Sequence, residues 1–156
     1  MKILIVDDEM TVLKKMESVL LPYGECTLAT SAEQALKLCA GAVGLGAPFD
    51  LITIDIHLQD SNGLDLLAAL NKMEKDKAVP VAKKIMVTAS GTKDNLLKAV
   101  TKGCDGFIVK PVKRDIMEQK MASLGFVKNS QETPETGSEP DAESTPAPEP
   151  DQSSPQ

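Results

Sequence analysis

The sequence predicts an α/β protein built around a doubly wound, five-stranded parallel sheet. Five apolar segments of strand length alternate strictly with five segments whose apolar residues recur at helical spacing. The first and last apolar segments, KILIV and GFIVK, lack the polar alternation of a half-exposed strand, as expected where helices cover both faces of a sheet. Strict alternation of strands and helices also favours parallel strands joined by helical crossovers.

The predicted strands are short apolar runs separated by amphipathic stretches. They cover residues 2–6, 26–30, 49–55, 84–89 and 106–110. In each predicted helix, the side chains expected to face the sheet recur three or four positions apart. In chain order these faces consist of Val12, Leu13, Met16, Val19 and Leu20; Ala32, Ala35, Leu36 and Cys39; Leu64, Leu67, Leu70 and Met73; Leu96, Leu97 and Val100; and Ile116, the aliphatic stem of Lys120, Met121 and Leu124.

Residues that favour helix ends agree with this order. The candidate N-caps are Ser31 for the second helix, Ser61 or Asn62 for the third, and Thr92 or Asp94 for the fourth. Gly103 is predicted to end the fourth helix in the left-handed conformation. The glycine-rich stretch 40–48 is predicted to be a flexible loop, since it precedes a strand and lacks the context of a phosphate-binding loop.

Composition favours one soluble domain. The chain has 156 residues, of which 42% are apolar and 26% charged, values typical of globular proteins. No apolar run approaches the roughly 20 residues that span a bilayer, and the N-terminus does not resemble a signal peptide. We therefore expect a cytoplasmic protein that does not insert into membranes.

The cysteines are predicted to be buried free thiols. Cys26, Cys39 and Cys104 are widely spaced and lie in apolar patterns, and the chain has one histidine and no CxxC pair. This arrangement favours neither a disulfide framework nor a zinc site.

The last part of the chain differs in composition from the rest. Residues 129–156 contain seven acids, no Lys or Arg, and two alanines as their apolar residues, too little apolar surface to offset the entropy of ordering. The first 128 residues carry a charge near +1 (17 − 16). We therefore expect a folded domain over residues 1–128 and a disordered acidic segment over 129–156, either without a partner or acting as a linker or recruiting segment. Its acidity argues against direct contact with nucleic acid.

The strand ends carry an unusual set of polar residues. The predicted first strand is followed by Asp7 and Asp8, the third ends in Asp55, the fourth reaches Thr88 and the fifth ends in Lys110. In open α/β sheets, ligands bind beyond the carboxyl ends of the strands. If the strand order is 2-1-3-4-5, as in flavodoxin-like folds, Asp55 lies close to the acidic pair.

Carboxylates this close together are stabilised by a nearby positive charge. Two carboxylates about 5 Å apart repel by roughly 3 kcal/mol at an effective dielectric constant near 20, so the cluster either raises a pKa or binds a cation. A site made of oxygen ligands favours Mg²⁺ over zinc. Together with Lys110, the metal would prepare Asp55 to attack a phosphorus centre as a covalent nucleophile.

The same residues resemble the receiver domains of response regulators, the CheY-like family, over about residues 1–125. IVDDE resembles the acidic pair of that family, LITIDIHLQDSNGLDLL its phosphoacceptor strand and following loop, IMVTAS its switch-threonine strand, and GCDGFIVKP its last strand with a lysine–proline step. The four motifs occur in the family's order. Gln59, where proline is frequent, and Asn62, where aspartate is more usual, are mild departures.

The resemblance implies a metal and phosphoacceptor site. Asp7 and Asp8 would hold Mg²⁺ directly or through water. Asp55 would be both a metal ligand and the phosphorylated residue, and His57 would contribute its backbone carbonyl.

The resemblance also implies a switch. Thr88 and Lys110 would each contact a phosphoryl oxygen, and the peptide between Lys110 and Pro111 would be cis. Phe107 occupies the position of the switch aromatic, although an aromatic residue there also suits an ordinary core strand. Phosphorylation would favour an active conformer that already exists.

The implied partners are a sensor histidine kinase or phosphotransfer protein as donor, with a small phosphodonor as a further source. The output partner would bind the face formed by the fourth helix, fifth strand and fifth helix. We expect the output to come through a partner protein, because no second folded domain is predicted after residue 128. The chain would catalyse its own phosphotransfer and dephosphorylation without being a conventional turnover enzyme.

The sequence disfavours three alternative functions, of which the first belongs to the same fold. A flavin or nucleotide binder would need phosphate-binding amides where the chain has Asp7, Asp8 and Glu9. A phosphohydrolase with an aspartate nucleophile would need an acid two residues later, where His57 stands. A pseudo-receiver, which binds partners without being phosphorylated, is disfavoured by the complete set of polar residues at the strand ends.

Overall fold

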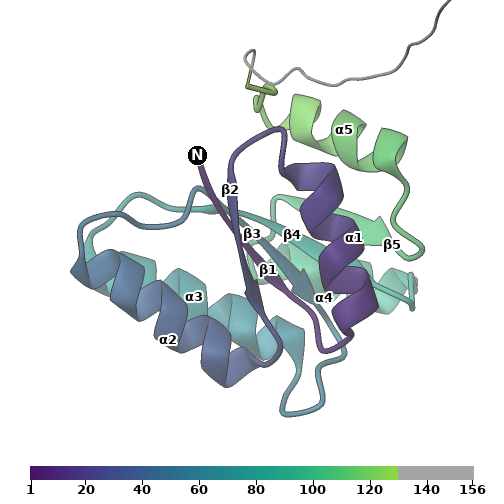
Figure 1. Cartoon of the computed structure of the whole chain (residues 1–156). Helices are drawn as coiled ribbons and strands as arrows, with labels where there is room; N and C mark the ends of the chain where they lie inside the picture. The colour runs from purple at the N-terminus through teal and green to yellow at the C-terminus, as the bar shows by residue number, and fades with distance from the viewer. Residues whose placement is uncertain (130–156) are drawn as a thin grey trace, which may run out of the picture.

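The computed structural model describes residues 1–129 and confirms the predicted fold class (Figure 1). Strands and helices alternate in the order β1 (Lys2–Val6), α1 (Met10–Leu20), β2 (Glu25–Ala29), α2 (Ala32–Gly44), β3 (Leu51–Asp55), α3 (Gly63–Lys77), β4 (Lys83–Thr88), α4 (Lys93–Thr101), β5 (Gly106–Val109) and α5 (Arg114–Ser123). The five strands are parallel and their order in the sheet is β2-β1-β3-β4-β5. This is the predicted flavodoxin-like order.

Helices cover both faces of the sheet, and a separate apolar cluster lies on each face. One cluster joins the sheet to α2, α3 and the single buried residue of α4, Ala99. The other joins it to α1 and α5 (Figure 1). Residues alternate between the two clusters along a strand: in β4, Met86 packs on the α2–α3 side, whereas Ile85 and Val87 pack on the α1–α5 side. This period of two is the geometry of an extended strand.

The structure shows which of the predicted residues cap the helices. The Ser31 side chain accepts a hydrogen bond from the Gln34 amide at the start of α2. Asn62 caps α3 and Thr92 caps α4, whereas Ser61 and Asp94 do not. Gly103 follows α4 with a φ of +92°, which confirms the predicted left-handed residue at that end.

The predicted core face of α4 was wrong. Leu96, Leu97 and Val100 are 43%, 64% and 58% exposed, and the helix is anchored through Ala99. In α5, Ile116 is 41% exposed, whereas Met117 and Met121 are fully buried. The spacing of apolar residues identifies the apolar stripe of a helix, but it does not show whether that stripe packs on the sheet or stays exposed, for example as a binding surface.

Two smaller predictions also change. The glycine-rich stretch begins inside α2, which continues to Gly44, so about half of the predicted loop is helical. All three cysteines are free, but only Cys39 is buried, whereas Cys26 and Cys104 are partly exposed.

The predicted acidic segment lies outside the described residues except for Asn129, whose amide donates to the Pro22 carbonyl at 2.7 Å. Over residues 1–129, the structure contains no helix with both the length and the apolarity needed to cross a membrane.

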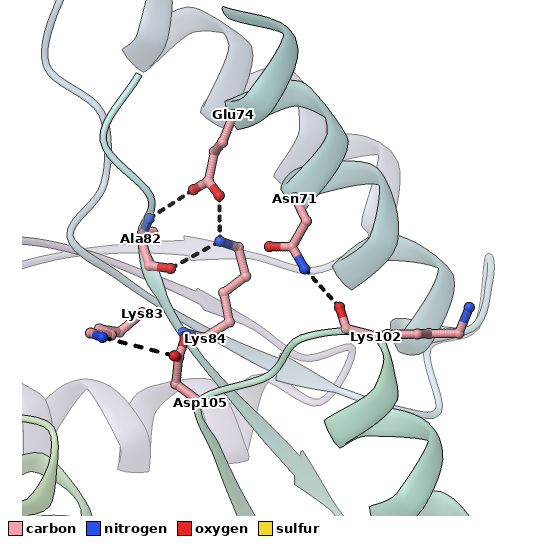
Figure 2. A network of polar contacts seen from close by, with 7 residues as sticks. All are labelled: Asn71, Glu74, Ala82, Lys83, Lys84, Lys102 and Asp105. Carbon is pink, nitrogen blue, oxygen red and sulfur yellow. Dashed lines mark hydrogen bonds and ion pairs between the residues drawn. The ribbon is translucent and has the colours of Figure 1, made fainter. Parts of the chain in front are cut away.

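A buried ion pair lies at the amino end of β4, where the sequence indicated only an apolar strand. The Lys84 side chain is fully buried, and its ammonium lies 2.5 Å from the Glu74 carboxylate of α3. The same ammonium donates to the Ala82 carbonyl at 2.9 Å, and the other Glu74 oxygen accepts from the Ala82 amide at 2.9 Å (Figure 2). The pair therefore ties α3 to the segment that leads into β4.

Candidate functional site

The parallel register brings the predicted polar residues to one edge of the sheet. Val6 pairs with Ile54, so the residues that follow β1 lie beside Asp55 at the end of β3. Thr88 ends β4 and pairs with Val109, the residue before Lys110. The three neighbouring strands β1, β3 and β4 are central, and the site therefore lies at the middle of the carboxyl edge.

One ammonium group holds the acidic residues together. The Lys110 Nζ atom lies 2.7 Å from Asp7 Oδ2 and 3.3 Å from Asp55 Oδ2. The exposed Glu9 carboxylate is 3.7 Å away from it. Both aspartates are nearly inaccessible, at 2% and 4% exposure. Two of the three acids after β1, Asp7 and Glu9, thus lie beside a positive charge.

Backbone amides fix the orientation of the two buried carboxylates. The Glu9 amide donates to Asp7 Oδ1 at 2.9 Å. The His57 amide donates to Asp55 Oδ1 at 3.2 Å. Each carboxylate therefore accepts from an amide through one oxygen and from Lys110 through the other.

The environment of Asp55 disfavours its negative charge. Burial raises the pKa of the Asp55 carboxyl, and the nearby Asp7 charge raises it further, while Lys110 and the His57 amide oppose the shift. Burial lowers the pKa of the Lys110 ammonium, but the hydrogen bond to Asp7 and the charges of Asp55 and Asp7 outweigh burial and raise it. Asp55 is thus an ionisable group that an added cation would stabilise.

The residues fit a divalent metal ion. Carboxylate oxygens of Asp7, Asp8 and Asp55 lie within 4.8 Å of one another. With Lys110 in contact with two of them, three negative charges and one positive charge leave a net charge of −2. Oxygen ligands of this kind suit Mg²⁺. Beside the cluster is an open depression of about 380 Å³, lined by Asp8, Ile56, His57, Leu58, Gln59, Ser61 and Asn62.

The fold and these strand-end residues agree with a comparison to known protein families. Residues 3–122 match the family described as the response regulator receiver domain. The chain belongs to this family. It is thus a CheY-like receiver domain, the module of two-component signalling that carries the fold described above.

Individual receiver domains are similar over most of their length. The chemotaxis protein CheY of Pseudomonas aeruginosa is 31% identical over 124 residues, which cover 80% of this chain and 95% of the relative. A CheY-like receiver domain protein from Methanospirillum hungatei is 29% identical, with a TM-score of 0.67 and coverage of 79% and 91%. A chain of the CheX–CheY–BeF3–Mg²⁺ complex from Borrelia burgdorferi is 25% identical, with a TM-score of 0.68 and coverage of 79% and 87%.

Three other predicted features of this receiver domain do not join the ion cluster: Thr88 at the end of β4, Phe107 inside β5, and the Lys110–Pro111 peptide. Thr88 is fully buried, and its hydroxyl accepts from the Ser90 amide at 3.1 Å. Phe107 is partly buried on β5 and packs against the α2–α3 core. The Lys110–Pro111 peptide is cis, as the family resemblance implied.

Two features that shape the site were not predicted from the sequence. Gly63 begins α3 against the backbone that follows β3, where a Cβ atom would collide with the Asp55 carbonyl. Asp60 bonds to the N-terminus of α2, 28 positions earlier in the chain. No local pattern predicts either contact, because each joins segments that only the fold brings together.

Proposed function

We propose that this receiver domain is a phosphorylation-dependent switch in which Asp55 accepts a phosphoryl group from a sensor histidine kinase or phosphotransfer protein. The observation that carries the proposal is the position of the Asp55 carboxylate, which is buried at the sheet edge between the Lys110 ammonium and the Asp7–Asp8 pair. An isolated structural aspartate would not need three further charged groups around it.

In the transfer, an Asp55 carboxylate oxygen forms a bond to phosphorus while the phosphorus–nitrogen bond of the donor phosphohistidine breaks. The donor imidazole keeps the electron pair of that bond. Lys110 neutralises negative charge beside Asp55, and Thr88 contacts a phosphoryl oxygen after its hydroxyl leaves the Ser90 amide. Preorganised positive charge of this kind stabilises the transferring phosphoryl group.

Asp7, Asp8, Asp55 and the His57 carbonyl would hold Mg²⁺. The bound ion supplies charge neutralisation for the phosphoryl oxygens. Three carboxylates at one sheet edge and the net charge of −2 support this assignment. The related Borrelia burgdorferi complex, which contains BeF3 and Mg²⁺, gives it further support.

The output partner is proposed to bind the α4–β5–α5 face. Exposed apolar side chains gather on these three elements: Leu96, Leu97, Val100, Val109 and Ile116. Apolar groups that a domain leaves in water commonly mark a protein-binding surface. Phosphorylation at Asp55 would change the affinity of this face through Thr88 and Phe107.

The remaining parts of the proposal concern the whole chain. Residues 1–128 would be the receiver domain, residues 129–156 a separate acidic segment, and the protein would work in the cytoplasm. The domain would catalyse its own phosphorylation from a small donor and its own dephosphorylation.

Intact mass spectrometry tests the proposal. The protein is incubated with Mg²⁺ and acetyl phosphate, in parallel with Asp55→Asn, with Asp115→Asn as a matched exposed acid, and with a chelator. One phosphoryl group should be added to wild type and to Asp115→Asn, and none to Asp55→Asn or to the chelated sample. If neither acetyl phosphate nor a histidine kinase phosphorylates the wild type, a pseudo-receiver that binds partners replaces this function.

A further inference from the structure

The loop between β3 and α3 folds back on itself directly after Asp55. The Gly63 amide donates to the Ile56 carbonyl at 2.7 Å, and His57 and Asn62 form an antiparallel bridge pair. These contacts close the base of the loop. Within its tip, residues 58–61, Leu58 is buried in the α2–α3 core, whereas the next three residues are exposed.

A carboxylate clips the loop tip to the start of α2. Asp60 Oδ1 accepts from the Ala32 amide at 3.1 Å, and Asp60 Oδ2 accepts from the Glu33 amide at 3.2 Å. The first amides of a helix have no partner within the helix. Ser31 accepts from the next amide, that of Gln34, at 3.1 Å. The N-terminus of α2 is therefore capped jointly by a local residue and by a loop from across the site.

The charge of Asp60 suits this contact. The positive end of a helix dipole attracts an anion. Hydrogen bonds from the Ala32 and Glu33 amides lower the pKa of the Asp60 carboxyl, so it stays ionised at neutral pH. A neutral side chain would keep less of this attraction.

The clipped loop forms part of the phosphoacceptor site. His57, at its base, donates from its amide to Asp55. Gln59 and Ser61, on either side of Asp60, line the depression next to Asp8. Among the hydrogen bonds of the described residues, those of Asp60 are the ones that attach the loop tip to a separate element. The contacts at the base of the loop and the buried Leu58 also hold His57, so releasing the tip from α2 would loosen the position of His57 beside Asp55 without freeing it completely.

We propose that Asp60 is a positioning residue of this receiver domain, which holds the β3–α3 loop against α2 and thereby places the His57 backbone for metal binding and phosphorylation at Asp55. The proposal rests on the proposed function for its role in phosphorylation. Its role in metal binding is tested without any phosphodonor. Residues that orient metal ligands from outside commonly change metal affinity by about 10- to 100-fold when replaced.

The test compares Mg²⁺ dissociation constants of the full chain, measured from the amide shifts of His57 and Glu9 by NMR. The variants are Asp60→Ala, Asp60→Asn and a control, Asp65→Ala. Asp65 is an exposed acid in the first turn of α3, so its removal reproduces the loss of one negative charge near the site. Urea unfolding of each variant measures the general effect on stability.

We expect Asp60→Ala to weaken Mg²⁺ binding by about 10-fold or more, and Asp60→Asn, which keeps one acceptor oxygen, to weaken it less. Asp65→Ala should stay within about twofold of wild type, because a screened surface charge has a small effect. The phosphorylation rate with acetyl phosphate should follow the same order.

An Asp60→Ala variant that is less stable but binds Mg²⁺ like wild type would overturn the proposal, since Asp60 would then be only a helix cap. Equal losses in Asp60→Ala and Asp65→Ala would also overturn it and would indicate a general charge effect. A wild type that binds Mg²⁺ but is never phosphorylated contradicts the proposed function and leaves the comparison of Mg²⁺ affinities intact.

Discussion

Replacing Lys84 by methionine should destabilise the protein by about 3–5 kcal/mol, the usual cost of leaving one member of a buried ion pair without its partner. The side chains of Lys84 and Glu74 are only 1% and 9% exposed, so water cannot replace the lost contact. In the variant, the Glu74 carboxylate keeps the hydrogen bond from the Ala82 amide and loses the ammonium. Methionine fills a similar volume, which limits the contribution of a cavity.

Removing both charges of the pair should destabilise the protein less than removing either one. In Lys84→Met/Glu74→Leu no buried charge remains, a change that is often neutral or stabilising by about 1–4 kcal/mol. Against this gain, both backbone groups of Ala82 lose their side-chain partners, at about 1–3 kcal/mol for each buried group left unpaired. The free energy of unfolding of the double variant is therefore expected to be close to or somewhat lower than that of wild type, and clearly higher than that of either single variant.

Urea unfolding followed by far-ultraviolet circular dichroism measures these free energies, since the chain has no tryptophan to report the transition. Lys72→Met is the matched control, because its ion pair with Asp76 is exposed and such pairs contribute at most about 1 kcal/mol. If the loss of stability in the double variant equals the sum of the losses in the two single variants, Lys84 and Glu74 are not energetically coupled and the prediction is refuted. A Lys84→Met variant as stable as Lys72→Met would refute the burial argument.

Three further predictions concern the site and the thiols. Burial raises the folded-state pKa of Asp55, so its ionisation opposes folding at neutral pH; Asp55→Asn should be more stable than wild type at pH 7, and the difference should vanish below about pH 4. A constant difference across a pH series of urea titrations would contradict this. Gly63→Ala should cost about 1–3 kcal/mol through overpacking, because the added Cβ meets the backbone of Asp55 and Ile56; unchanged thermal unfolding would be the contrary result. Burial raises the pKa of Cys39 to about 12 and that of Cys26 to about 11. At pH 8 iodoacetamide should therefore alkylate both thiols slowly in the folded protein, and Cys39 about tenfold more slowly than Cys26. Unfolding in urea should remove both effects. Equal rates by peptide mass spectrometry would show that the folded environment does not control them.

The fold could be predicted because its main signals are local. Each strand of this sheet is a continuous apolar run, and each crossover is an amphipathic helix, so the alternation is visible without any knowledge of contacts. Caps such as Ser31 act within three residues of themselves. The order of strands then follows from the few ways in which parallel crossovers connect a doubly wound sheet.

The helices were harder to orient. Apolar residues at helical spacing in α4 predicted a buried face, but the sheet edge needs only Ala99 from that helix. Spacing alone cannot distinguish an apolar stripe that meets the core from one that stays exposed. The same limit explains why Ile116 rather than Met117 was expected inside.

The sequence by itself determined the fold class, the family and the identities of the charged residues at the strand ends, because these depend on residue order and on motifs of adjacent residues. Only the tertiary structure decided that Lys110 contacts Asp7 and Asp55 at once, that Glu74 and Lys84 form a buried pair, and that Asp60 caps a helix 28 positions away. Each of these contacts joins segments far apart in the chain. Their strength depends on burial and distance, quantities that exist only once the chain has folded.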